Sequence, residues 1–247
     1  MKGLTRDAID KAESRDFAIG KGPLRPRDSA TLLLLDRSGP ELKVLMGKRH
    51  HAHAFMPGRF VFPGGRTDPA DARVPVSSAL ADAEMSKMCA LTGARFTPAR
   101  ARAIAMSAVR ETYEEAGILI GERTSYQTRA EGWQAFAAHG VAPSLKGLRM
   151  VARAITPPGR VRRFDTRFLA AWRDEAGLEL PEGGPTGELE ELMWLSFEEA
   201  KQADIPLITK TVIEELQKRL HKDPGLEPGG TVPFYRMLRG EFLRDML

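Results

Sequence analysis

The sequence of 247 residues contains a single cysteine, Cys89. No internal disulfide bond can form, which excludes the disulfide-stabilised extracellular domains and is typical of a reducing compartment. The apolar neighbours Met85, Met88 and Leu91 favour a buried structural thiol over a nucleophile at this position.

Long apolar segments are also absent. The longest strongly apolar run, residues 32–35, is far too short to span a bilayer. Residues 1–16 are polar and mixed in charge, which is unlike a signal peptide. We therefore expect a cytoplasmic protein without a membrane partner.

A strong excess of one charge is missing as well. The chain has 37 Lys and Arg against 33 Asp and Glu, a net charge of +4. No stripe of basic and aromatic residues indicates nucleic acid as a partner. The mild positive charge suits a small polyphosphate, and the 42% hydrophobic content is typical of a globular protein.

The most informative stretch that is present covers residues 110–117, with the sequence Arg-Glu-Thr-Tyr-Glu-Glu-Ala-Gly. Glu111, Glu114 and Glu115 are spaced i, i+3 and i+4, so on a helix they are neighbours that repel one another. A solvated acidic face is one interpretation. A hard cation between the carboxylates is the other, because Mg²⁺ and Mn²⁺ prefer oxygen ligands.

The surroundings of this stretch favour the cation. Thr97 and Pro98 are a hydroxyl N-cap and an N1 proline, which start a helix, and Gly117 is a residue suited to end it. An apolar stripe at helical period would anchor this helix on a sheet. The carboxylates would then face Gly64 and Gly65, where a backbone without side chains can approach a phosphate or a metal closely.

These motifs resemble the Nudix hydrolase family, whose box joins a glycine half to an Arg-Glu-x-x-Glu-Glu-x-Gly half. Asp71 follows Gly65 after five residues, where the family has Glu. Between Asp71 and Arg110 lie 38 residues where the family has seven, so the box is split by an insertion of 31.

The resemblance implies an α/β protein with the Nudix fold, a mixed β-sheet sandwiched between helices. We expect one domain over residues 1–247, with a recognisable core at about 31–199 and a helical insertion at about 72–102. Helical spacing predicts helical N- and C-terminal additions, at 4–18 and at about 206–247. The stretch from 232 to 247 could pack on the core or on a second subunit, as in a homodimer.

The resemblance also implies the roles of the site residues. Glu111, Glu114 and Glu115 would bind Mg²⁺ or Mn²⁺ with the backbone carbonyl of Gly64, and Arg110 would orient the carboxylates. A general base would come from the box or from the predicted late strand, which carries Glu188, Glu190 and Glu191.

A second resemblance concerns the substrate. Residues 45–65 are similar in spacing to the signature of the coenzyme A diphosphatase branch, with departures at Gly47, His50, Ala54 and Phe60. The residues that we expect to contact substrate are Arg49, His50, Arg66, Arg162 and Arg163.

The sequence therefore predicts a metal-dependent pyrophosphohydrolase of nucleoside diphosphate-linked substrates. Coenzyme A or acyl-CoA, cleaved to phosphopantetheine and adenosine 3′,5′-bisphosphate, is the first candidate, and an ADP-ribose or dinucleotide diphosphatase is the alternative. Two further hypotheses are a non-catalytic nucleotide-sensing domain on the same fold and a helical interaction protein built on residues 206–247.

Overall fold

The computed structural model describes residues 24–50 and 56–247. The helix predicted at residues 4–18 lies outside these ranges, as does Ala54 of the coenzyme A diphosphatase signature. Within the described ranges, no helix is both long and apolar enough to cross a membrane.

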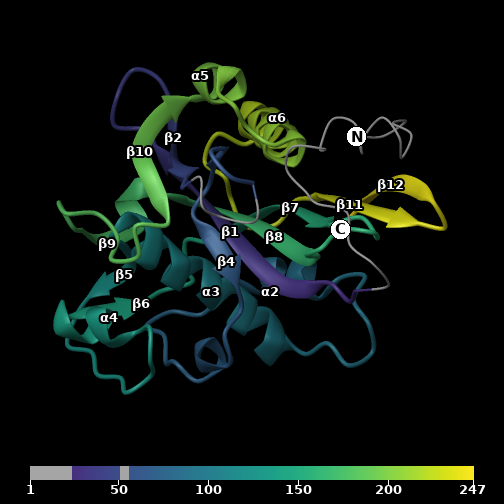
Figure 1. The fold of residues 1–247 in the computed structure, drawn as a ribbon. Helices are drawn as coiled ribbons and strands as arrows, with labels where there is room; N and C mark the ends of the chain where they lie inside the picture. The colour runs from purple at the N-terminus through teal and green to yellow at the C-terminus, as the bar shows by residue number, and fades with distance from the viewer. Residues whose placement is uncertain (1–23, 51–55) are drawn as a thin grey trace.

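One mixed sheet runs through the middle of the molecule (Figure 1). Its strands follow the order β10-β2-β1-β8-β7-β11-β12, with β3 paired to β2 and β4 paired to β1. The pairs β1–β8 and β7–β11 are parallel. The strands are β1 (Arg27–Asp36), β2 (Lys43–Arg49), β3 (Phe60–Val61), β4 (Gly64–Arg66), β7 (Arg149–Ile155), β8 (Phe164–Trp172), β10 (Leu189–Ser196), β11 (Pro233–Leu238) and β12 (Glu241–Met246).

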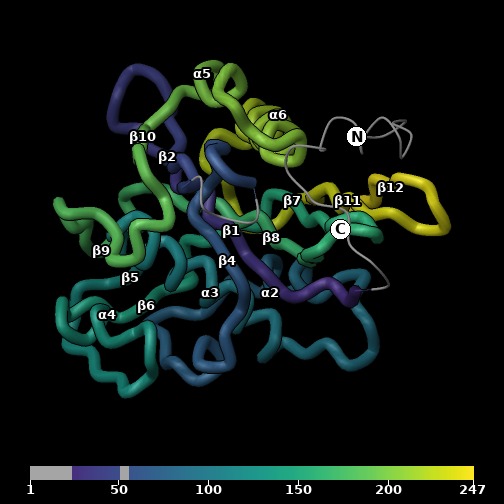
Figure 2. Tube along the Cα trace, viewed as in Figure 1, coloured from purple at the N-terminus to yellow at the C-terminus, as the bar shows by residue number. Residues whose placement is uncertain are grey.

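A second, three-stranded sheet has the order β6-β5-β9. It lies on the side of the main sheet that also carries α2, α3 and α4, whereas α5 and α6 cover the other side (Figure 2). The remaining elements are η1 (Pro69–Ala72), α2 (Asp82–Cys89), α3 (Pro98–Ala116), β5 (Ile118–Arg123), α4 (Gln134–Ala138), β6 (Val141–Pro143), η2 (Arg173–Glu175), β9 (Ala176–Glu179), α5 (Phe197–Gln202) and α6 (Leu207–Lys222).

The alternation of side chains along β1 explains the two helical layers. Leu32 and Leu34 are fully buried against the side of α3, and Leu33 and Leu35 are fully buried against α5 and α6. A strand with both faces buried reads as a continuous apolar run, because successive side chains point to opposite faces. The predicted mixed sheet between helices is confirmed.

Helix α3 begins and ends where its caps predict. The Thr97 hydroxyl accepts a hydrogen bond from the backbone N–H of Arg100, and Pro98 occupies the first helical position. Gly117 adopts the left-handed conformation, with φ of 72°, and its N–H donates to the carbonyl of Tyr113. The apolar stripe, which includes Ile104 and Val109, is buried as expected.

Residues 72–102, the expected insertion, contain less helix than their sequence predicts. The helical pattern extends over residues 77–91, but α2 covers only Asp82–Cys89. The preceding residues pair with another segment instead, since the Ser77 N–H donates to the carbonyl of Pro143 and Ser78 forms a bridge with Ser144. Tertiary pairing therefore overrides the helical pattern at this end.

The predicted helix over residues 232–247 is wrong, and β10 is not the last strand. This stretch forms the hairpin β11–β12, in which β11 also pairs with β7. The apolar spacing that indicated a helix skips over Gly240, which reverses the chain. Arg239 and Gly240 both have positive φ, 52° and 86°, as a two-residue turn between antiparallel strands requires.

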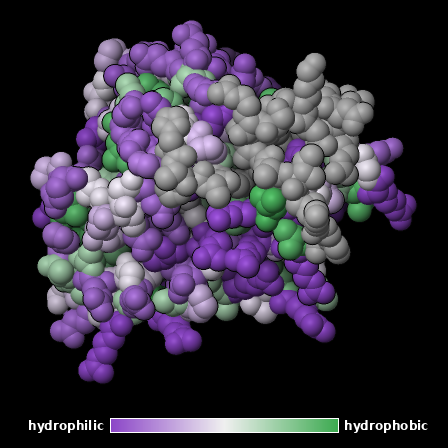
Figure 3. Space-filling view, viewed as in Figure 1, coloured by the Kyte–Doolittle hydropathy of each residue, from purple (hydrophilic) through white to green (hydrophobic). Residues whose placement is uncertain are grey.

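The face of the molecule shown in Figure 3 carries mostly hydrophilic side chains, with apolar ones in small groups.

Candidate functional site

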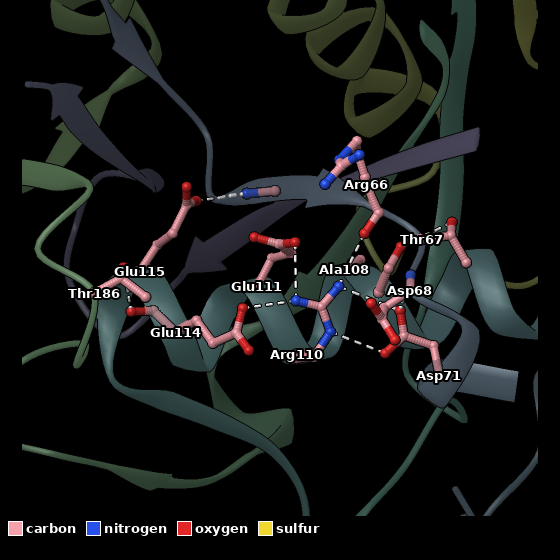
Figure 4. A network of polar contacts seen from close by, with 12 residues as sticks. Arg66, Thr67, Asp68, Asp71, Ala108, Arg110, Glu111, Glu114, Glu115 and Thr186 are labelled. Carbon is pink, nitrogen blue, oxygen red and sulfur yellow. Dashed lines mark hydrogen bonds and ion pairs between the residues drawn. The ribbon is translucent and has the colours of Figure 1, made fainter. Parts of the chain in front are cut away.

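The last turns of α3 bring Arg110 into the centre of a network of carboxylates (Figure 4). One guanidinium nitrogen, Nη1, donates to Glu111 at 3.0 Å and to Glu114 at 2.6 Å. The other two nitrogens hold Asp71, and Nη2 also donates to the carbonyl of Arg66 at 2.9 Å. Burial alone would lower the pKa of Arg110, but the hydrogen bond to Asp71 and the charges of Glu111, Asp71 and Glu114 raise it. Arg110 is therefore fixed in place and stays charged.

Asp71 is the buried anchor of this network. Its side chain has no exposed surface, and it accepts from Arg110 at 2.9 and 3.2 Å and from the indole N–H of Trp133 at 3.1 Å. It also closes the capping box of η1 with the backbone of Asp68. The sequence places Asp71 at the position of a family glutamate but does not reveal this bond to Arg110, because 38 residues separate the two.

Two of the three glutamates, Glu111 and Glu115, meet the glycine pair on β4. The backbone N–H of Gly64 donates to Glu115 at 2.8 Å. A Cβ atom added to Gly65 would lie 2.4 Å from the carboxylate of Glu111. The lack of a side chain at Gly65 therefore allows the Glu111 carboxylate to lie directly on the β4 backbone.

Burial changes the acidity of these carboxyl groups. It raises the pKa of Glu111 to about 7, against the opposing charge of Arg110. It raises the pKa of Glu115 to about 8, although the hydrogen bond from Gly64 favours the charged form. Burial also raises the pKa of Glu114. Three carboxylates crowded in a partly dry site gain from any nearby positive charge.

The donor chemistry fits a hard divalent cation. One oxygen of each glutamate accepts a hydrogen bond, Oε1 of Glu111 and Oε2 of Glu114 and Glu115, and the second oxygen accepts none from the described residues. Oxygen donors of this kind suit Mg²⁺ and Mn²⁺. Within residues 24–50 and 56–247, however, no three acidic, histidine or cysteine side chains are gathered closely enough to enclose an ion.

The carboxylates lie at one end of a cavity of about 670 Å³. Arg49, Arg66 and Arg162 are among the residues that line it. The side chains of Arg66 and Arg162 form no hydrogen bond or ion pair with the described part of the chain, whereas Arg49 lies 3.6 Å from Glu188. The two arginines therefore leave their charge available to a ligand.

Two of the predicted substrate contacts lie elsewhere. Arg163 donates to the backbone carbonyls of Thr156 and Leu24, at 2.9 and 2.6 Å, and thereby fixes the loop after β7. His50 lies 3.4 Å from Glu190. Neither is among the described residues that line the cavity.

The three candidate bases also differ in whether they line the cavity. Glu188 lines the cavity beside the box glutamates. Glu190 pairs with His50, and Glu191 pairs with Lys48 at 3.0 Å, both outside the described lining. A bulge in β10 after Glu190, with Glu191 at φ of 46°, alters the regular alternation of these side chains.

The cavity also has walls that the sequence motifs do not indicate. Its far end is formed partly by the C-terminal hairpin, through Tyr235, Arg236 and Phe242. A helix over residues 232–247 would have placed these residues on other faces, so the sequence did not predict this contribution.

Comparisons with known proteins agree with this fold. No family model matches the sequence. A curated relative, "Putative nudix hydrolase 7" of Caenorhabditis elegans, is 28% identical over 204 residues, which cover 74% of this chain and 56% of the relative. The chain thus spans little more than half the length of that relative.

A solved structure gives the same indication. The crystal structure of a NUDIX hydrolase from Alicyclobacillus acidocaldarius superposes with a TM-score of 0.55 and 26% sequence identity, over 77% of this chain and 90% of that one. The fold is that of the Nudix hydrolases, and both likenesses support this family for the chain.

Proposed function

We propose that the protein is a metal-dependent pyrophosphohydrolase that cleaves nucleoside diphosphate-linked substrates. The observation that carries the proposal is that Glu111, Glu114 and Glu115 line one end of the cavity, where Glu111 and Glu115 lie against the β4 glycines. The resemblance of residues 64–71 and 110–118 to a Nudix box, and the likeness to a NUDIX hydrolase structure, support it.

The three glutamates and the backbone carbonyl of Gly64 would hold Mg²⁺ or Mn²⁺. A bound divalent cation neutralises charge on a diphosphate and lowers the pKa of an attacking water. The oxygens that accept no hydrogen bond offer one ligand from each glutamate.

The chain's own residues position the reactants. Arg110 keeps two of the carboxylates in place through bonds that Asp71 fixes in turn. Arg66 and Arg162 would bind phosphate oxygens, because a guanidinium matches their geometry with paired N–H groups. Glu188 is the candidate base that shares the cavity with the carboxylates, and we assign it the proton of the attacking water.

The identity of the substrate is inferred from the sequence. Coenzyme A or acyl-CoA is the first candidate, on the strength of the signature over residues 45–65. ADP-ribose and dinucleotides are the alternatives. Each contains a diphosphate joined to a nucleoside, so each would present the same anionic group to the same carboxylate end.

Product analysis tests the reaction directly. CoA, acyl-CoA, ADP-ribose, NADH and a nucleoside triphosphate are incubated with Mg²⁺ or Mn²⁺, and the products are separated by chromatography. We expect cleavage at the diphosphate and none with EDTA. Formation of phosphopantetheine and adenosine 3′,5′-bisphosphate would support the CoA branch, and cleavage of ADP-ribose or NADH alone would discard it.

Glu114→Gln is the matched variant, since it keeps the size of the side chain and removes its charge. Mutation of a residue that only supports a metal ligand lowers metal affinity or activity by about 10- to 100-fold. Glu114 is a proposed ligand itself, so we expect kcat to fall by at least about 100-fold. Full activity in this folded variant would refute the metal site. Metal-independent binding of nucleotides without any turnover would instead favour the nucleotide-sensing alternative.

A further inference from the structure

The floor of the cavity extends far beyond the carboxylates. Gly64 on β4 lies opposite Thr31 on β1, which lies opposite Phe168 on β8. Two residues before Phe168, Thr166 lies opposite Ala154 on β7, and Ala154 lies opposite Tyr235 on β11. All six residues line the cavity, so its floor runs across five neighbouring strands.

Neighbouring strands lie about 4.8 Å apart, so four steps from β4 to β11 cover roughly 19 Å. The carboxylate end occupies only the beginning of this length. The cavity therefore has room for a group attached to the diphosphate, and the C-terminal hairpin is the wall that such a group would reach.

The far end has a different chemistry from the carboxylate end. Its aromatic residues are Phe164, Tyr235 and Phe242. Aromatic rings of this kind bind nucleobases by stacking, because every base has a flat face. A flexible aliphatic chain gains little from such planar partners beyond apolar contact.

The wall is held in place by its own contacts. The Tyr235 hydroxyl donates to Glu215 on α6 at 2.8 Å and accepts from Arg244 at 3.2 Å. Arg236 pairs with Asp245 at 2.9 Å across the hairpin. A surface fixed in this way loses little conformational entropy when a ligand binds to it.

We propose that the nucleobase of the substrate binds against the C-terminal hairpin, with Phe242 as its stacking partner, while the diphosphate lies at the carboxylate end. This proposal rests on the function proposed above and assigns the two halves of the substrate to the two ends of the cavity. The hairpin is thereby a specificity element that lies outside the recognisable Nudix core.

Product inhibition separates the two halves. Cleavage of ADP-ribose yields AMP, which carries the base, and ribose 5-phosphate, which does not. We expect Phe242→Ala to raise the inhibition constant of AMP by about 5- to 100-fold, as loss of one stacking partner does, and to leave that of ribose 5-phosphate unchanged. With CoA as substrate, the corresponding pair is adenosine 3′,5′-bisphosphate and phosphopantetheine.

Three further variants serve as controls. Phe242→Tyr keeps the ring and should keep the affinity for AMP, whereas Phe242→Leu keeps apolar volume without a ring and should lose it. Leu243→Ala lies next to Phe242 on β12 but is outside the described lining, so it should leave both inhibition constants unchanged. Thermal unfolding establishes that each variant retains the fold.

Weaker inhibition by ribose 5-phosphate or phosphopantetheine in Phe242→Ala would overturn the proposal, because the other half would then lie on the wall. Full affinity for AMP in Phe242→Leu would also overturn it, in favour of an apolar chain. Calorimetric titration of AMP into the wild type and Phe242→Ala does not need turnover. If no diphosphate is cleaved, the proposed reaction fails, and this titration still decides whether the base binds at the hairpin.

Discussion

The two ends of the cavity are built in different ways. The carboxylate end depends on a buried charge network, in which Arg110 joins Asp71 to Glu111 and Glu114. The hairpin end depends on two strands at the margin of the sheet, in which Tyr235 is buried and Phe242 and Arg236 are partly exposed. The comparison indicates that the charged groups are held in fixed positions where the chemistry would occur. The side chains of the hairpin, in contrast, could be replaced without disturbing this charge network.

The largest effect on stability should come from removing Asp71. Asp71→Ala leaves the buried guanidinium of Arg110 without its bidentate partner and the Trp133 indole without an acceptor. Breaking a buried ion pair costs about 3–5 kcal/mol, so we expect the free energy of unfolding in urea to fall by that amount.

The matched control is Asp174→Ala, which removes the exposed ion pair with Arg37 at 2.6 Å. Exposed pairs contribute at most about 1 kcal/mol. Similar losses in the two variants would contradict the anchoring role of Asp71.

The next effect should appear in activity rather than in stability. Gly65→Ala places a methyl group where the Glu111 carboxylate lies, at 2.4 Å. The flexible end of Glu111 can move away, so we expect the free energy of unfolding to fall by no more than about 1 kcal/mol. Displacement of a positioned group by about 1 Å can cost about 100-fold in rate, and we expect kcat/KM to fall by that order.

Gly39→Ala is the control for this variant, because a Cβ atom there has no neighbour within 4 Å. Its kcat/KM should equal that of the wild type. An equally active Gly65→Ala variant would show that the close approach of Glu111 to β4 is unimportant for the reaction.

The carboxylate end also shows how much of the structure the sequence alone predicts. The caps of α3 and the spacing of its glutamates are local features, so Thr97, Pro98 and Gly117 predicted the helix correctly. The apolar run 32–35 lies within the central strand β1, whose two faces are both buried. The bond between Asp71 and Arg110 was not predictable in this way, since it depends on how the 38 residues between them fold.

The hairpin end was missed for a different physical reason. Phe234, Met237, Leu238 and Phe242 fit a helical period, but pairing of β11 with β7 gives the backbone other hydrogen-bonding partners. The signal that could have identified the hairpin is Gly240, a poor helix former in the middle of the apparent helix. The aromatic wall of the cavity followed from that turn and could not be expected without it.

A pH series without metal would sharpen the comparison at the carboxylate end. The pKa values of Glu111 and Glu115 are raised by burial to about 7 and about 8, from an ordinary value of 4.5. The native state therefore binds these protons more tightly than the unfolded chain does, and stability falls as the pH rises from about 5 to 8. We expect the thermal midpoint in EDTA to decrease over this range.

Glu115→Gln should flatten this decrease, because the amide does not titrate. Added Mn²⁺ should raise the midpoint more at pH 8 than at pH 6, since ligands must be deprotonated to bind a metal. A wild-type midpoint that rises with pH in EDTA would contradict the burial of these carboxyl groups.

The smallest effect concerns the turn of the hairpin. Arg239 has φ of 52°, which costs energy for most side chains and less for asparagine, and it is followed by Gly240 in the turn between β11 and β12. Arg239→Asn should therefore raise the free energy of unfolding by a few tenths of a kcal/mol (about 0.5 at most), measured in urea. Gly240→Ala should lower it by about 1 kcal/mol, because φ there is 86°.

Neither variant touches the carboxylate end, so kcat should stay at the wild-type value in both. A fall in kcat in either variant would mean that the two ends are not independent, and that the hairpin positions the reacting groups as well as the base.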